Sequence, residues 1–246
     1  FAGSPATFGS TDGTGSAARF SKPTGLGIDT SGNLYVADQS NHLIRKVTPS
    51  GVVSTVAGTA GASGQVDGTG TAARFSSPMG VAADTSGNLY VSDYGNHLIR
   101  KISTSGAVTT IAGVGGAAGF LDGTGYLLTA AFYRNPNGIA VSGTNAYVAD
   151  TGNNLIRRNA QDVKVTTLAG SAGSTGFADG TGTDARFNAP GGLSADGAGN
   201  VYVADAGNHT IRKITSGGVV STLAGNRLTP GSADGFVLRY GVNSAP

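Results

Sequence analysis

The chain has 246 residues and a net charge of +2, with 42 glycines, no cysteine and 14 acidic residues that are all aspartate. Without cysteine it has no disulfide framework and no thiolate metal site, and no apolar run approaches the ~20 residues of a membrane helix, so we expect no membrane insertion. Basic residues that are spread evenly along a nearly neutral chain argue against a nucleic-acid partner.

The first predicted elements are four short strands. They read GLGID (25–29), NLYVAD (33–38), NHLIRKV (41–47) and VVSTVA (52–57), and turn-forming residues fill each connection between them. This pattern predicts a four-stranded antiparallel meander. Because LYVA is apolar on both faces of its strand, the sheet has to be covered on both sides.

The same pattern recurs along the chain, with a DG pair opening each long loop. We expect one domain over 1–246, with repeats at about 24–78, 79–135, 136–190 and 191–246 after a leading inter-blade loop at 1–23. Identical sheets stacked around an axis cover each other's faces, so the predicted fold class is all-β, a β-propeller of four-stranded antiparallel blades. The repeated DG pairs begin at Asp12, Asp67, Asp122, Asp179 and Asp234.

These repeats resemble those of the NHL-repeat β-propeller family, named after the Asn-His-Leu found here at 41–43 and 96–98. The GNLYVAD and NHLIRK segments match the family pattern as well, four times over nearly the whole chain. The third repeat departs from it, with Asn154 in place of histidine and without the aspartate that ends the first strand elsewhere (Asp29, Asp84, Asp196). The resemblance implies a four-bladed ring or part of a six-bladed propeller.

Almost all titratable residues belong to the repeated motif, and we interpret them as structural. Asp and Asn side chains bond to nearby backbone groups in turns, and the three equivalent histidines are expected on strand faces. The alternative is a ring of carboxylates that holds a cation near the axis. We predict no catalytic residue, no metal and no cofactor. The structural set is Asp38, Asn41, His42, Asp93, Asn96, His97, Asp150, Asn153, Asp205, Asn208 and His209.

Each long loop ends in an aromatic residue that we expect to fill the seam between neighbouring sheets. The residues in this place are Phe20, Phe75, Phe132 and Phe187. The arginine that precedes three of them is expected to pair with the aspartate of its own loop, at Arg19, Arg74 and Arg186.

The clearest break in the repeat is the third loop. Asp122 to Pro136 spans 14 residues where the equivalent spans are 11, and its Tyr, Leu and Arg residues have the composition of an interaction hot spot. We expect these side chains to be exposed and to bind a partner; the alternative is that the loop folds over its own blade. The candidates are Tyr126, Leu127, Leu128, Tyr133 and Arg134, with Tyr94 in the second repeat as a lesser one.

Together these patterns predict a non-enzymatic binding or structural module whose partner is a protein or a carbohydrate. Richness in Gly, Ser, Thr and Ala with few Lys favours a bacterial, secreted or surface protein. The alternative is a propeller lyase or hydrolase with an axial divalent cation, because such enzymes occur on related propellers. RNA binding, known in the family, is disfavoured by the near-balanced charge.

The two ends of the chain carry the same kind of loop and do not complement each other. The chain opens with FAG, the tail of a fourth strand, and it stops at Pro246 after a fifth DG loop. A propeller normally closes when one terminus supplies the strand that the other end lacks. We therefore expect a segment of a longer array, completed by further blades of the parent protein or by a second copy in a homo-oligomer.

Overall fold

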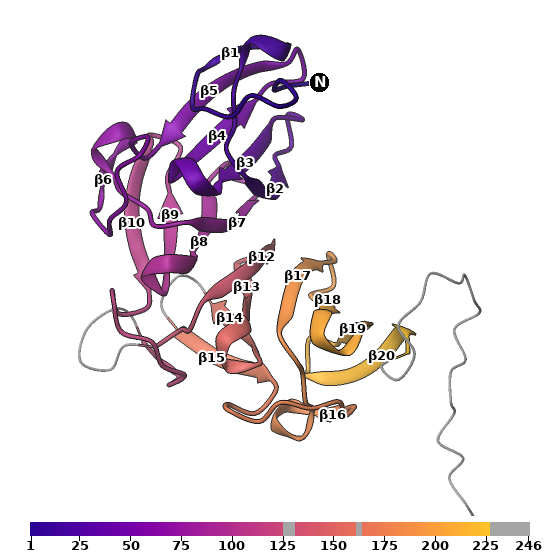
Figure 1. Cartoon of the computed structure of the whole chain (residues 1–246). Coiled ribbons are helices and arrows are strands. Elements are labelled where there is room, and N and C mark those ends of the chain that lie inside the picture. The colour runs from indigo at the N-terminus through magenta and orange to yellow at the C-terminus, as the bar shows by residue number, and fades with distance from the viewer. Residues whose placement is uncertain (125–130, 161–163, 227–246) are drawn as a thin grey trace, which may run out of the picture.

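A computed structural model describes residues 1–124, 131–160 and 164–226 of the chain. These residues form four antiparallel sheets that follow one another along the chain and stand side by side in an arc (Figure 1). The all-β prediction is confirmed, and the arc is open, not the closed four-bladed ring that was one of two expectations. The described part contains no helix with the length and apolar character needed to span a bilayer.

Each sheet is the expected meander, extended by one short strand. In the first sheet, β2 (Pro23–Ile28), β3 (Leu34–Asp38), β4 (Leu43–Val47) and β5 (Val52–Ala57) pair in chain order, and β1 (Gly13–Thr14) adds to the free edge of β5. The first strand therefore begins at the proline, two residues earlier than the apolar pattern indicates.

The other three sheets repeat this order. Their strands are β6 (Gly68–Thr69), β7 (Pro78–Ala83), β8 (Leu89–Asp93), β9 (Leu98–Ile102) and β10 (Ala107–Ala112); β11 (Gly123–Thr124), β12 (Pro136–Ser142), β13 (Asn145–Asp150), β14 (Leu155–Ala160) and β15 (Lys164–Ala169); and β16 (Gly180–Thr181), β17 (Pro190–Ala195), β18 (Val201–Asp205), β19 (Thr210–Ile214) and β20 (Val219–Gly225). Because β6, β11 and β16, like β1, each join the sheet that follows them, each of the four long loops before a described sheet belongs to that sheet.

Single turns of 3-10 helix are the only helical elements in the described residues. Three lie in the long loops, at η1 (Gly15–Ala17), η3 (Gly70–Ala72) and η6 (Gly182–Asp184). Four others join the second and third strands of each sheet, at η2 (Gln39–Asn41), η4 (Tyr94–Asn96), η5 (Thr151–Asn153) and η7 (Ala206–Asn208).

The asparagine and histidine of the NHL motif are turn residues, which corrects the expectation that they lie in a strand. Asn41 ends η2, and His42 has a left-handed backbone with φ of 60° before β4 begins. The equivalent residues His97, Asn154 and His209 have φ of 60°, 58° and 57°. Asparagine is among the residues that tolerate this conformation best, which explains why Asn154 can replace histidine.

The hydrophobic core lies between the sheets. We call the face of each sheet that looks toward the preceding sheet its leading face, and the opposite one its trailing face. The trailing face of the first sheet, with Tyr35 and Ile44, packs on the leading face of the second, with Leu89 and Val91. Equivalent clusters join the second sheet to the third and the third to the fourth. Burial of this apolar surface is the main force that holds neighbouring sheets together.

An aromatic side chain fills each of the three seams, as expected, but between the second and third sheets it is Tyr133 and not Phe132. Phe75, Tyr133 and Phe187 are all fully buried, whereas Phe132 is partly exposed. Each of these three residues lies three positions before the proline that opens the next strand. The third loop has an insertion, so its seam residue is found by counting back from the proline and not forward from the DG pair.

Candidate functional site

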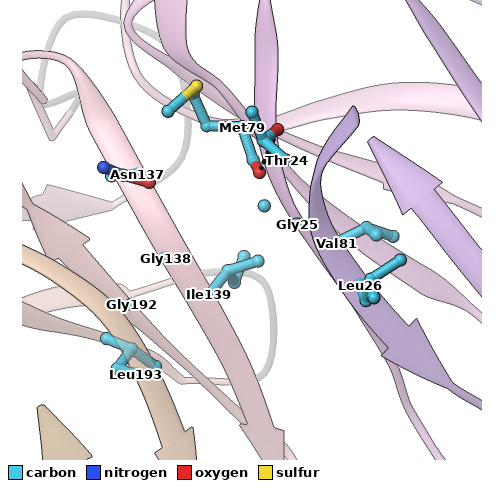
Figure 2. A pocket seen from close by; sticks show the side chains of 11 residues that line it. Thr24, Gly25, Leu26, Met79, Val81, Asn137, Gly138, Ile139, Gly192 and Leu193 are labelled. Atoms are coloured by element: carbon cyan, nitrogen blue, oxygen red, sulfur yellow. Dashed lines mark hydrogen bonds between the residues drawn. The ribbon is translucent and has the colours of Figure 1, made fainter. Parts of the chain in front are cut away.

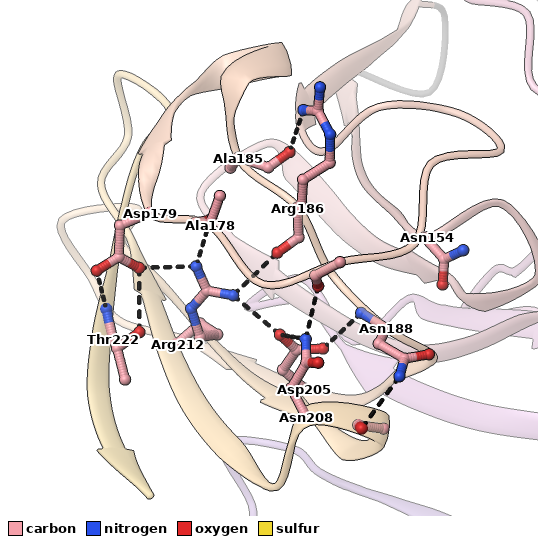
Figure 3. Close-up of polar contacts among 12 residues, drawn as sticks. Asn154, Ala178, Asp179, Ala185, Arg186, Asn188, Asp205, Asn208, Arg212 and Thr222 are labelled. Carbon is pink, nitrogen blue, oxygen red and sulfur yellow. Dashed lines mark hydrogen bonds and ion pairs between the residues drawn. The ribbon is translucent and has the colours of Figure 1, made fainter. Parts of the chain in front are cut away.

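Each sheet holds one fully buried arginine between two aspartates, which accounts for most of the repeated charges. In the fourth sheet, Arg212 Nη1 lies 2.9 Å from Asp205 Oδ2 and Nη2 lies 2.7 Å from Asp179 Oδ1 (Figure 3). Arg212 and Asp205 are inaccessible, while the Asp179 carboxylate is half exposed. The same two ion pairs, at 2.6 to 3.0 Å, surround Arg45, Arg100 and Arg157.

The half-exposed aspartate of the DG loop ties the outer strand to this arginine. Asp67 accepts hydrogen bonds from the backbone N–H and the hydroxyl of Thr110, at 3.1 and 3.0 Å, in addition to its ion pair with Arg100. The expected pairing of Arg74 with the aspartate of its own loop is therefore wrong. Arg74 donates to the carbonyls of Thr71 and Ala73 instead, and Arg19 and Arg186 do the same in their loops.

The buried aspartate at the end of the second strand is surrounded by donors. Asp93 accepts from the backbone N–H of Ser76 at 2.7 Å, from Asn96 Nδ2 at 2.7 Å and from Arg100 Nη1 at 3.0 Å. Burial raises the pKa of Asp93 to about 6, although these donors act to lower it. These three donors all belong to the repeat, so their bonds to the carboxyl join the turn to the loop.

The motif histidines connect one sheet to the next. His42 Nδ1 accepts the backbone N–H of Ser77 at 3.0 Å, and His97 Nδ1 accepts that of Asn135 at 3.1 Å. In the third repeat, Asn154 Oδ1 accepts the N–H of Ala189 at 2.8 Å. The expected place of the histidines on strand faces is wrong, because the left-handed turn aims each ring across the seam.

This bond makes the seams sensitive to acid. Burial lowers the pKa of His42 and His97 below 6.5, so the unfolded chain takes up these protons first and stability is lost as the pH falls through that value. The His42→Asn, His97→Asn double variant gives both seams the residue that Asn154 supplies in the third repeat. We expect it to show a weaker loss of melting temperature than the native chain between neutral pH and about pH 5. Parallel melting curves for the two proteins over this range would contradict the prediction.

A shallow groove runs along the axis, lined by the innermost strands of all four sheets. Leu26, Val81, Ile139 and Leu193 line it, one from each of β2, β7, β12 and β17 (Figure 2). Thr24 and Asn137 are the polar side chains among its described lining residues, and its volume is about 240 Å³. The innermost strand of each sheet therefore lines the axis, and the repeated aspartates lie elsewhere.

The described residues contain no cluster of three or more histidine and aspartate side chains that could hold a metal ion. The buried aspartates are each enclosed in their own sheet, so they do not converge on the axis. What the groove offers a ligand is apolar contact, backbone polar groups and two uncharged polar side chains, Thr24 and Asn137.

The predicted binding residues fall into three groups. Tyr126, Leu127 and Leu128 lie outside the described residues. Tyr133 was expected to be exposed, and this is wrong, because it is the buried seam residue and its ring stacks on Arg157 at 5.1 Å. Arg134 is exposed, and Tyr94 is half-buried at the start of η4.

Two further exposed residues lie on the segment whose backbone pairs with the one that carries Arg134. Phe120 is 53% exposed and Leu121 is 58% exposed. Backbone hydrogen bonds from Phe132 to Leu121 and from Gly119 to Tyr133 hold the two segments side by side. We call Phe120, Leu121 and Arg134 the rim patch. Alignment of the loops on their DG pairs gives only part of this signal. Leu121 is larger than its equivalents Thr11, Val66 and Ala178, but Phe120 has Phe177 as its equivalent in the fourth repeat.

Comparison with known proteins gives matches to repeat families and to repeat-containing proteins. The NHL repeat family matches residues 20–47, 75–102 and 187–214, and the LVIVD repeat family matches residues 134–156. NHL repeat-containing protein 2 of Bos taurus is 34% identical over 154 residues, which are 57% of this chain and 21% of that protein. The chain thus spans about a fifth of this relative.

Two solved structures show a similar fold. An auxiliary nutrient binding protein from Bacteroides ovatus superimposes with a TM-score of 0.63 at 19% identity, over 88% of this chain and 55% of that one. A streptogramin B lyase superimposes with a TM-score of 0.55 at 13% identity, over 82% of this chain and 54% of that one. At sequence identities this low, the similarity shows a shared fold, that is, the arrangement of the sheets, and nothing more.

Proposed function

Three of the four sheets contain a match to the NHL repeat, and from this premise we propose that the chain is a non-enzymatic binding module built of β-propeller blades. The observation that carries the proposal is the rim patch. Three repeats place small or polar residues at the position of Arg134, namely Ser21, Ser76 and Asn188, whereas the third combines an exposed arginine with exposed Phe120 and Leu121. A scaffold does not fix function, so its departures from symmetry are the best candidates for a site.

The chemistry of the patch fits a macromolecular or sugar ligand. Aromatic, aliphatic and arginine side chains together form the usual centre of a binding interface, and an aromatic ring can also stack on the apolar face of a sugar. We further propose that the partner is a protein or a carbohydrate and that the parent protein is bacterial and secreted or surface-bound. The similarity in fold to a nutrient binding protein from Bacteroides ovatus supports this.

A propeller lyase or hydrolase with an axial divalent cation is the alternative. The similarity in fold to streptogramin B lyase favours it. The described lining of the groove supports it less, because Thr24 and Asn137 are the polar side chains there and neither carries a charge.

A test compares the native chain with the triple variant Phe120→Ser, Leu121→Ser, Arg134→Ser. We expect the native chain to bind members of a glycan array or of a displayed peptide library, and the variant to bind them at least about tenfold more weakly with an unchanged melting temperature, because exposed residues contribute little to folding. The control is Val66→Ser, which removes another exposed apolar side chain from the second sheet.

The outcome of the two screens also decides the ligand class. Glycan hits alone identify a carbohydrate partner, and peptide hits alone identify a protein partner. Ligands that bind the native chain and the triple variant equally well would contradict a site at the rim patch. Cleavage of an array ligand that requires an added divalent cation would favour the enzyme.

A further inference from the structure

We infer that the two end sheets of the arc are docking faces for each other, so that a second copy of the chain binds head to tail: the trailing face of the fourth sheet in one copy covers the leading face of the first sheet in the other. The two faces cannot meet within one chain, because the second and third sheets lie between them and the arc stays open (Figure 1).

The trailing face of the fourth sheet carries the residues that are buried in every other sheet. Ile211 is 41% exposed, whereas the equivalent residues Ile44, Ile99 and Ile156 are fully buried. Ala204 is partly exposed on the same face, while its equivalents Ala37 and Ala149 are fully buried. The residue types on this face are those of an internal seam. The difference is that no following sheet covers this face in the described residues.

The leading face of the first sheet shows the complementary pattern. Leu26 is 65% exposed, whereas its equivalent Val81 in the second sheet is 2% exposed. Ile28, next along the same face, is also largely exposed. Phe20 holds the place of the seam residues Phe75 and Phe187 but is only partly buried, because no sheet covers it in the described arc.

The backbone at both ends is already shaped for the seam hydrogen bond. In each internal seam, a left-handed residue before the proline donates its N–H to the motif residue of the preceding sheet, as Ser77 donates to His42. Lys22 has the donor's conformation, with φ of 54°, and His209 has the acceptor's, with φ of 57°. Within the described part of the chain neither of them makes this bond, so one end offers a donor and the other an acceptor.

A second copy of the chain can supply both faces, and it is the occupant we propose. Three internal seams show that a trailing face of this sequence is covered by a leading face of this sequence, with one hydrogen bond of fixed geometry and an apolar cluster. Head-to-tail contacts use two different patches, so each copy has both halves of the interface, and two copies can close on each other or continue into a chain.

The test uses two variants with one blocked face each. Ile211→Lys places a charge on the trailing face, and Ile28→Lys places one on the leading face. We expect the native chain to sediment as a species of at least two copies, and each variant alone as a single copy. An equimolar mixture of the two variants should recover a two-copy species, since one intact trailing face then meets one intact leading face.

Both changed side chains are exposed, so the melting temperatures should stay near that of the native chain, and Val66→Lys on another exposed surface should associate like the native protein. A native chain that remains a single copy at all concentrations would overturn the inference, and so would variants that associate normally or a mixture that stays single. A chain that ends at Asn226 and associates while the full chain does not would also overturn it, by showing that residues 227–246 occupy the face.

Discussion

Replacing Arg100 with methionine is expected to lower the free energy of unfolding by about 3 to 5 kcal/mol. The change leaves the carboxyl of Asp93 buried without the guanidinium that lies 3.0 Å from it, and it releases the loop carbonyls of Arg74 and Val66 that the same guanidinium binds. A buried charge that has lost its partner is costly even where the intact pair contributes little. Urea denaturation followed by circular dichroism measures the difference.

The matched control acts on the other end of the same arginine. Asp67 is half exposed, so Asp67→Asn is expected to cost about 1 kcal/mol or less, because water replaces the ion pair. If the two variants were equally stable, the buried pair would not be the contact that joins loop and strands.

The second large effect is expected at the seams. Phe75→Ala should lower the free energy of unfolding by about 3 to 5 kcal/mol, because a fully buried ring between two sheets is removed and leaves a cavity. Phe20→Ala should cost clearly less, since Phe20 occupies the same place on the uncovered leading face of the first sheet.

This pair of variants separates seam packing from the contact with arginine. Phe20 and Phe75 each lie 5.2 Å below the guanidinium of their own sheet, Arg45 and Arg100, so that contribution is the same in both. Denaturation should be measured at high dilution, where the end face of one copy is not covered by another. If both variants lost the same free energy of unfolding, the ring would stabilise the fold through its contact with arginine, and packing in the seam would contribute nothing.

The sequence predicts the strands of this fold well because their signals are local. Short apolar segments, glycine turns and a repeat of 55 to 57 residues are enough to predict four meanders and their mutual stacking. The Asp-to-Asn turn is local as well, because Asp93 and Asn96 are three residues apart.

The burial of the repeated arginines could not be predicted from such local signals. Arg100 lies in the strand LIRKI with no local sign that it is inaccessible, and its partner Asp67 is 33 residues away in a loop. The position of the histidines depends on a positive φ, which a single residue type does not reveal. The rim patch depends on exposure, which for Phe120 is opposite to the usual preference of phenylalanine.

The assignment of each long loop to the sheet that follows it has a consequence for how such chains change in length. A unit cut just after Ala57 or Ala112 contains one loop, one complete meander, one leading face and one trailing face. Duplicating that unit in a gene inserts one sheet and creates one new seam, between the two copies, where a trailing face meets a leading face as in the existing seams, and deleting it also joins a trailing face to a leading face. Blade number can therefore vary between descendants by whole units without any compensating mutation.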